Sequence, residues 1–263
     1  MKLRELIKLL DGAFPFSLAL SWDNSGLQVG DCEQEISSVA VALDPTFEVV
    51  SKALELGVSC LVTHHPLIFK PLRSVTSDTP VGQTVMALVE HNLSLVSLHT
   101  NLDVAPGGLA DYVASLLGLE VEGPLLVDEE RDLGRVGLTT NSLDFREFLT
   151  LVRTALGGGN CRIVNPPRSG EKRVWKVALC PGSGGDLVFQ AVAVGAQVYI
   201  TGDLKYHQAV DASSLGLTVI DAGHYGTEMP AVALLCKTLR SLVGKGITVF
   251  EIETEDPFKE DLS

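Results

Sequence analysis

Short apolar segments alternate with amphipathic segments along the chain. In the first half the pattern predicts, in order, strands at 39–43, 60–63 and 93–98 and helices at 47–57, 81–92 and 107–118. Nearly every strand position is apolar, which is typical of a sheet covered on both faces. Alternation of strands with helices is typical of an α/β protein with a parallel or mixed sheet.

The same alternation resumes after a break. Residues 121–134 are charged and contain Pro124, so we interpret them as a linker or crossover. The second half then predicts strands at 134–140, 174–180, 198–201, 217–220 and 247–253, helices at 145–158 and 229–244, and a surface loop at 165–173. A helical pattern also follows each of the three strands from 174 to 220, and residues 1–10 form an amphipathic helix.

The two halves resemble each other in sequence. Residues 41–65 align with 177–203 if the second copy has two extra residues, and 98–103 align with 223–228. Apolar matches arise from α/β patterning alone, but in both copies a histidine precedes a carboxylate by four residues. We therefore expect two similar three-layer α/β domains that face each other. Their predicted extents are 1–125 plus 245–263 for the first and 126–244 for the second.

Composition narrows the classes of function. The hydrophobic share is 46% and the mean hydropathy is +0.26, which indicates a globular chain. With 20 basic against 33 acidic residues the net charge is −13, and no run of lysine and arginine occurs. Such a field repels phosphate backbones and argues against nucleic-acid binding, whereas it suits a protein that holds divalent cations.

The spacing of the cysteines and the length of the apolar segments predict the cellular compartment of the protein. The five cysteines are odd in number and form no CxxC pair, so we interpret them as reduced core residues in a reducing compartment. The charged first ten residues do not resemble a signal peptide. No apolar run approaches the roughly 20 residues of a membrane span. We expect a cytoplasmic protein without membrane contact.

Polar side chains gather where the predicted strands end, which is where sites form in open α/β sheets. They are Asp44, His64, His65, His99, Asp103, Asp203, Asp221, His224 and Glu228. Imidazole and carboxylate together suit zinc, iron, manganese or nickel. One ion needs three or four protein ligands, so this larger set allows two ions bridged by a carboxylate. His207 follows one turn into the next helix, and His91 stands apart in a helix.

The adjacent pair His64 and His65 raises a geometric question. Neighbouring side chains of a strand point to opposite faces, so both rings reach one point only if the strand has ended, and otherwise they serve two targets. Two ions would supply two targets. Taken singly, each histidine is more often a structural hydrogen-bonding residue, Asp44 before Pro45 suits a turn and helix cap, and Asp221 suits a cap or a hydrogen bond to a ligating histidine. The joint occurrence of HH, HxxxD and HxxxE favours metal.

Two other schemes fit less well. Ser–His–Asp chemistry on an α/β fold uses a GxSxG turn, which does not occur in the sequence. The segment CPGSGGD at 180–186 is rich in glycine and follows a strand, but it lacks the GxxxxGK[ST] pattern of a phosphate-binding loop. We interpret it as a tight strand-to-helix turn.

Five motifs resemble one known family. They are WDNSGLQVG (22–30), THHPLIF (63–69), SLHTNLD (97–103), ITGDLKYH (200–207) and DAGHYGTE (221–228). In this order they are similar to the GTP cyclohydrolase type-two homologues, also called the Ngg-interacting-factor-three-like or dinuclear-metal-centre family. The resemblance runs from about residue 5 to the last strand and corresponds to the compact form of the family without an inserted middle domain.

The resemblance implies a site and an assembly. It implies two α/β domains facing each other across a cleft that contains two divalent metal ions, and hexamers of such chains. At matching positions the implied metal ligands are His64, His65, Asp103, His224 and Glu228. The resemblance also places His99, His207 and Asp203 nearby, and either of these histidines would move protons. Further candidates for contact with a substrate are Trp22, Asn24, Tyr206 and Tyr225. Lys205 suits either contact with a phosphate or a solvated helix start.

Two functions follow from these residues. The first is a metal-dependent hydrolase that acts on a nucleotide, through ring opening of the GTP cyclohydrolase kind, or on another small phosphorylated or heterocyclic molecule. The second is a non-catalytic metal-binding or regulatory protein that works through protein contacts. Turnover that a chelator abolishes and added metal restores would distinguish the first from the second.

Overall fold

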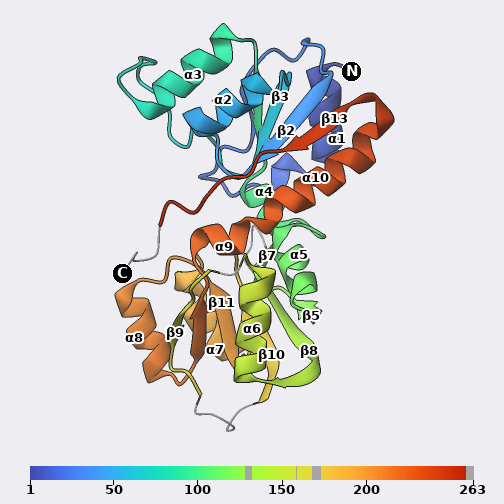
Figure 1. Ribbon diagram of the computed structural model, residues 1–263. Helices are drawn as coiled ribbons and strands as arrows, with labels where there is room; N and C mark the ends of the chain where they lie inside the picture. Colours follow the sequence, from blue (N-terminus) through green and yellow to red (C-terminus); the bar gives the residue numbers. More distant parts are fainter. Residues whose placement is uncertain (128–131, 158, 168–172, 259–263) are drawn as a thin grey trace. The chain divides into compact units, whose positions relative to one another are not determined.

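The computed structural model describes residues 1–127, 132–157, 159–167 and 173–258 (Figure 1). The chain divides into two compact units. The first unit comprises Met1–Ala105 and Ala231–Ser263, and the second comprises Pro106–Pro230. Each unit contains a mixed sheet with helices against it, so the α/β fold class predicted from the sequence is confirmed.

The first unit is built on a five-stranded sheet of order β1-β4-β3-β2-β13. Its strands are β1 (Gly26–Val29), β2 (Ser38–Ala42), β3 (Cys60–Thr63), β4 (Ser94–Ser97) and β13 (Thr248–Glu251). All pairings are parallel except that of β1 with β4. Ala42, Thr63 and Ser97 lie in one register, so β2, β3 and β4 end together at one edge of the sheet.

Helices cover both faces of this sheet. They are α1 (Leu3–Ala13), α2 (Phe47–Glu55), α3 (Pro80–Glu90), α4 (Thr100–Val104) and α10 (Pro230–Val243). In Figure 1, α2 and α3 lie on one side of the sheet and α1 and α10 on the other. Ala40 and Ala42 of β2 pack with Val49, Val50 and Leu88 of the helices on the first side. Burial of alternate strand residues on opposite faces explains why the strands are apolar throughout.

The second unit contains a six-stranded sheet of order β5-β8-β10-β11-β12-β9 and a small hairpin. Its strands are β5 (Leu119–Gly123), β8 (Arg135–Asp144), β9 (Arg162–Val164), β10 (Arg173–Leu179), β11 (Val198–Thr201) and β12 (Thr218–Asp221), with β6 (Leu126–Val127) and β7 (Asp132–Leu133) in the hairpin. Strands β10, β11 and β12 are parallel, and the others pair antiparallel.

The helices of the second unit are α5 (Leu109–Leu116), α6 (Phe145–Ala155), α7 (Val188–Ala193), α8 (Tyr206–Ser214) and α9 (His224–Glu228). Residues of α7 and α8 pack with Ala178, Tyr199 and Val219 in one apolar cluster on the sheet. Asp144 begins α6 by accepting hydrogen bonds from Arg146 N and Glu147 N.

The two units share a topological core, as the sequence echo suggested. Three parallel strands, β2-β3-β4 or β10-β11-β12, each precede a helix, and the third strand pairs with an antiparallel edge strand. In both units the helix after the third strand has five residues. His99 lies at the N-terminus of one, and His224 begins the other.

The segment predicted as a linker is instead structured. The described residues of 121–134 contain most of β5 and all of β6 and β7, while 128–131 lie outside the described residues. The units divide at Ala105/Pro106 and Pro230/Ala231, whereas the sequence placed these boundaries at 125/126 and 244/245. The reason is packing: buried Arg135 of β8 donates from Nε to Asp111 Oδ1 of α5 at 2.5 Å, which fixes α5 in the second unit.

Other predicted segments differ in detail. The strand predicted at 134–140 extends to Asp144, and the edge strands β1 and β9 were not predicted. Most of the loop predicted at 165–173 lies outside the described residues, as does residue 158 at the end of one predicted helix. Within the described part of the chain, every helix falls short of the length and apolarity that a bilayer crossing requires.

All five cysteines are free thiols, but Cys32 is exposed and is therefore not the core residue the sequence suggested. Burial raises the pKa of Cys60 to about 12 and that of Cys236 to about 11. A raised pKa lowers the share of thiolate, so both of these side chains stay protonated at pH 8.

We expect thiol labelling at pH 8 to modify Cys32 of the folded protein, and Cys60 and Cys236 only after unfolding. Peptide mapping after timed exposure to iodoacetamide measures this order. Labelling of Cys60 in the native protein at the rate of Cys32 would contradict it.

Candidate functional site

Three histidines of the first unit form a cluster at the carboxyl edge of its sheet. His64 and His65 follow β3, and His99 follows β4. One ligand atom from each lies within 4.8 Å of the others. The ring centroids of His64 and His65 are 5.0 Å apart. Strand β3 ends at Thr63, so the strict alternation of side chains ends as well, and both rings of the adjacent pair reach the same cluster.

Each ring of this cluster is oriented by a hydrogen bond at Nδ1. The acceptors are Leu98 O at 2.8 Å for His64, Asp44 Oδ1 at 2.7 Å for His65 and Asp23 Oδ1 at 2.8 Å for His99. A carbonyl or carboxylate oxygen only accepts, so Nδ1 of each ring carries the hydrogen of this bond. This arrangement, in which a second oxygen fixes the tautomer, is the usual one for histidines that bind metal.

The carboxylate of Asp23 accepts several hydrogen bonds at the carboxyl edge of this sheet. Its side chain is fully buried and accepts from His99 Nδ1, Thr100 N, Thr100 Oγ1 and Ser25 Oγ. Burial alone would raise the pKa of the Asp23 carboxyl. The hydrogen bonds from His99, Thr100 and Ser25, together with the charge of His99, outweigh burial and hold that pKa well below its usual range. Asp23 thus stays an anion that orients His99.

Asp103 adds a carboxylate to the histidine cluster. It lies on α4, four residues after His99, so both side chains project from the same side of one helical turn. Its Oδ1 is 3.6 Å from His64 Nε2. The first unit therefore brings together four of the predicted site residues, namely His64, His65, His99 and Asp103.

The second unit carries a histidine–carboxylate pair on α9. His224 Nε2 is 2.8 Å from Glu228 Oε2, four residues further along the helix, and Glu228 is buried. The Nδ1 atom of His224 bonds to Asp203 Oδ2 at 2.8 Å. His224 is therefore oriented through Nδ1, as are the three histidines of the first unit.

Two loops hold this pair in place. Asp203 follows β11 with φ +52°, a left-handed conformation that aspartate tolerates better than most residues. Buried Asp221 accepts from Leu204 N at 3.2 Å and Gly223 N at 3.1 Å, and pairs with the Arg162 guanidinium. Asp221 therefore ties the loop of Asp203 to the loop of His224.

The glycine-rich turn at 180–186 lies directly against Glu228. Gly182 has φ +66°, and a Cβ there would be 2.1 Å from Glu228 Oε1. Gly182 N also donates to Thr227 Oγ1, so this turn packs against α9. Only glycine allows the carboxylate to approach the backbone this closely.

If Glu228 binds a metal ion, we expect Gly182→Ala to weaken that binding, because the new methyl group displaces the carboxylate. Gly216→Ala is the matched control, since Gly216 has φ +72° and open space around it. Gly216→Ala should lower the free energy of unfolding by about 1–2 kcal/mol through backbone strain, and Gly182→Ala should lower it further because it also displaces the buried Glu228 carboxylate. Calorimetric zinc titration should show the loss of affinity for Gly182→Ala alone, and equal affinities would contradict the expectation.

The remaining predicted residues have other surroundings. The side chain of Asn24 donates to Ile68 O at 2.6 Å and so braces two loops. Lys205 is exposed and precedes α8, where its backbone N donates to Gln208 Oε1. Tyr206 and His207 are exposed, with ring centroids 5.4 Å apart. The proton-transfer role of His207 stays a prediction, as does that of His99.

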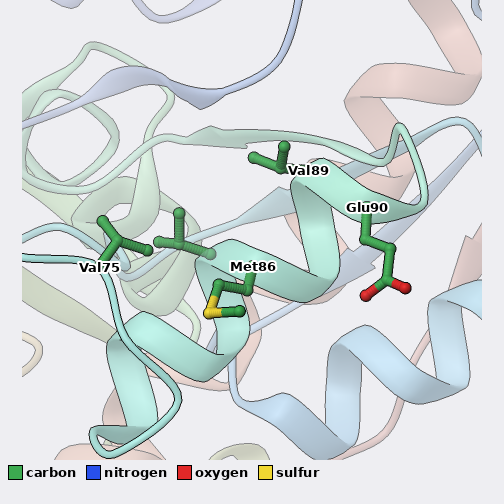
Figure 2. Close-up of a pocket in the computed structure, with 5 residues that line it drawn as sticks. Val75, Met86, Val89 and Glu90 are labelled. Atoms are coloured by element: carbon green, nitrogen blue, oxygen red, sulfur yellow. The ribbon is translucent and has the colours of Figure 1, made fainter.

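A separate surface depression lies beside α3 (Figure 2). Val75 comes from the loop before the helix, and Val85, Met86, Val89 and Glu90 come from the helix itself. The lining is mostly apolar, and none of the predicted site residues belongs to it.

Sequence reasoning missed two residues of this site. Asp23 lies within the WDNSG motif, in which Asn24 and not Asp23 was predicted as a site residue. Arg162 lies on an edge strand that was not predicted. Asp44 was interpreted as a turn residue, whereas its carboxylate bonds to His65. A buried carboxylate that bonds to a distant histidine leaves no local pattern in the sequence.

The fold and these side chains define an α/β protein with groups of histidine and carboxylate residues that could bind a metal ion. The family model of Duf34/NIF3 (NGG1p interacting factor 3) matches residues 1–257. The chain therefore belongs to the Duf34/NIF3 family, which confirms the resemblance seen in its motifs.

Relatives and solved structures agree with this membership. A GTP cyclohydrolase 1 type 2 homolog of Clostridium perfringens is 34% identical over 98% of this chain and 99% of the relative. A protein of the same name from Methanocaldococcus jannaschii is 39% identical over 87% and 91%. Among solved structures, a hypothetical protein of Staphylococcus aureus matches with a TM-score of 0.88 at 30% identity, covering 99% of each chain. Reduced HcgD from Methanocaldococcus jannaschii matches with a TM-score of 0.83 at 35% identity, covering 97% of this chain and 98% of that one.

Proposed function

We propose that this chain is a metal-dependent hydrolase that binds two divalent ions and acts on a nucleotide, with ring opening of GTP as the first reaction to test. One observation supports the proposal: the rings of three proposed ligands, His64, His65 and His224, are each oriented by a hydrogen bond between Nδ1 and an oxygen, as is usual for histidines that bind metal. The names of the relatives suggest the substrate.

The donor set fits zinc, iron, manganese or nickel, because it combines imidazole nitrogen with carboxylate oxygen and includes no cysteine. The proposed ligands are His64, His65, Asp103, His224 and Glu228. Metal ions bound there would supply Lewis-acid chemistry for hydrolysis. The protein would keep the histidine ligands in position through Leu98 O, Asp44 and Asp203. His99, oriented by Asp23, or His207 would move the proton.

Turnover tests this function. Elemental analysis measures the metal content of protein purified without added metal. The protein is then loaded separately with each of the four metals. Chromatography measures its turnover of GTP, phosphodiesters and phosphomonoesters. We expect GTP to be consumed, a chelator to stop the reaction and metal to restore it. Stoichiometric metal without turnover on any substrate would reject the hydrolase and leave a metal-binding protein that works through protein contacts.

The number of ions and their arrangement are measured separately. Two ions per chain are expected from calorimetric titration. In a shared dinuclear centre, His65→Ala and Glu228→Gln would each weaken both ions, whereas ions held separately would be lost one at a time. The hexamer implied by the family resemblance stays a prediction, and light scattering of the purified protein measures it.

A further inference from the structure

Two large aromatic side chains lie exposed beside the histidine cluster. Trp22 is 56% exposed and Phe69 is 46% exposed. Their ring centroids are 5.7 Å apart with an interplanar angle of 53°. Both rings approach the ring of His99, at 6.0 Å and 6.2 Å, with interplanar angles of 74° and 72°. Trp22 and Phe69, here called the aromatic platform, therefore border the histidine cluster at His99, within one unit.

The platform is held by hydrogen bonds of the backbone and side chains around it. The residue after the indole is buried Asp23, which accepts from Thr100 N and Oγ1. The residue before the phenyl ring is Ile68, whose carbonyl accepts from Asn24 Nδ2 and whose N donates to Gln28 Oε1 at 3.2 Å. Because these bonds join the two loops, the rings are preorganised and would lose little entropy on binding a ligand.

We propose that the aromatic platform binds the planar heterocyclic ring of the substrate by stacking on Trp22, and thereby places that ring next to His99. The two rings leave apolar area in contact with water, and a bound ligand would cover that area. Every nucleobase has a π-face, so stacking accepts such rings without demanding one base. The proposal rests on the proposed function only in taking this ring as part of the substrate.

Charge in the same loop favours a phosphorylated ring. Lys70 and Arg73 follow Phe69 within four residues, and both are exposed. They are positive side chains in a chain whose net charge is −13. A nucleoside phosphate offers an aromatic ring for Trp22 and an anion for these cations. The substrate class is therefore a nucleotide or a similar phosphorylated heterocycle.

Fluorescence tests the platform without any need for turnover. The chain contains two tryptophans, so Trp175→Phe leaves Trp22 as the only indole. We expect GMP, AMP and UMP to change the emission of Trp22 in a saturable way, and ribose 5-phosphate, which has no ring, to leave it unchanged. Absence of a response to all three nucleotides, or an equal response to ribose 5-phosphate, would overturn the proposal.

Variants separate stacking from folding. In calorimetry, Trp22→Leu should weaken GMP binding by about 5- to 150-fold, the range that loss of one base–aromatic stack produces. Trp22→Phe should restore most of the affinity. Trp175→Leu is the matched control, since Trp175 is 53% exposed on the other unit, and it should leave affinity unchanged. Unchanged affinity in Trp22→Leu would overturn the platform.

The two proposals fail in different ways. If Trp22-dependent GMP binding persists in protein that shows no metal-dependent turnover, the hydrolase is rejected and the platform stands. If GTP is hydrolysed and Trp22→Leu has the same KM as the unaltered protein, the platform is rejected and the hydrolase stands.

Discussion

His65→Ala is expected to lower the affinity of the protein for zinc or manganese by more than about 100-fold, because loss of a supporting residue alone typically costs 10- to 100-fold and His65 is a proposed ligand. Its ring is oriented by Asp44 at 2.7 Å and lies in the cluster with His64 and His99. The side chain is only partly buried, so its removal leaves little cavity. Elemental analysis of purified protein and calorimetric titration measure the loss.

His91→Ala is the matched control for this prediction. His91 is an exposed histidine that caps α3 in the same unit, away from the strand ends. The same substitution there should leave metal content, metal affinity and turnover unchanged. Full metal occupancy in His65→Ala, or an equal loss in His91→Ala, would show that the cluster is not the metal site.

Asp23→Ala is expected to have the largest effect on stability, lowering the free energy of unfolding by about 3–5 kcal/mol. Removing one partner of a buried charged network leaves the other buried groups uncompensated. Here the donors left behind are His99 Nδ1, Thr100 N and Oγ1, and Ser25 Oγ. Urea denaturation of metal-free protein measures the change. Asp78→Ala, at an exposed position, should change stability by less than about 0.5 kcal/mol.

The same carboxylate predicts acid sensitivity. The pKa of Asp23 in the folded state lies below the ordinary value of 3.8 for a free aspartate, so the folded state favours the ionised form. Its contribution is therefore present above about pH 4 and is lost as pH falls further, because the unfolded chain takes up a proton first. Metal-free Asp23→Asn should lose less stability between pH 5 and pH 3 than the unaltered protein, and identical losses would contradict this assignment.

Much of the candidate site could be predicted because parallel strands end together. Ala42, Thr63 and Ser97 share one register, so the residues after each of them meet at one edge. His64, His65 and His99 each follow an apolar strand in the sequence, and this position was enough to predict them as site residues. The repeated spacing of a histidine and a carboxylate likewise indicated His224 and Glu228, which the sequence placed after a strand end and the structure places on α9.

The supporting residues could not be predicted in the same way. Asp23 bonds to His99 across 76 positions of sequence, and Arg162 pairs with Asp221 across 59. Such pairs depend on which loops pack together, and no local periodicity records this. The edge strands β1 and β9 were not predicted for a related reason. Short strands with partly exposed faces lack the continuous apolar pattern of central strands.

The sequence by itself determined the α/β class, the order of the central strands and helices, and the residue types that gather after the strands, because these depend on local periodicity and on the chemistry of single side chains. Only the tertiary structure decided where the two units divide, which oxygen orients each histidine, and that Trp22 and Phe69 lie beside His99. The physical reason is that those features arise from packing and hydrogen bonds between segments distant in the chain, whose partners are fixed only once the whole unit has folded.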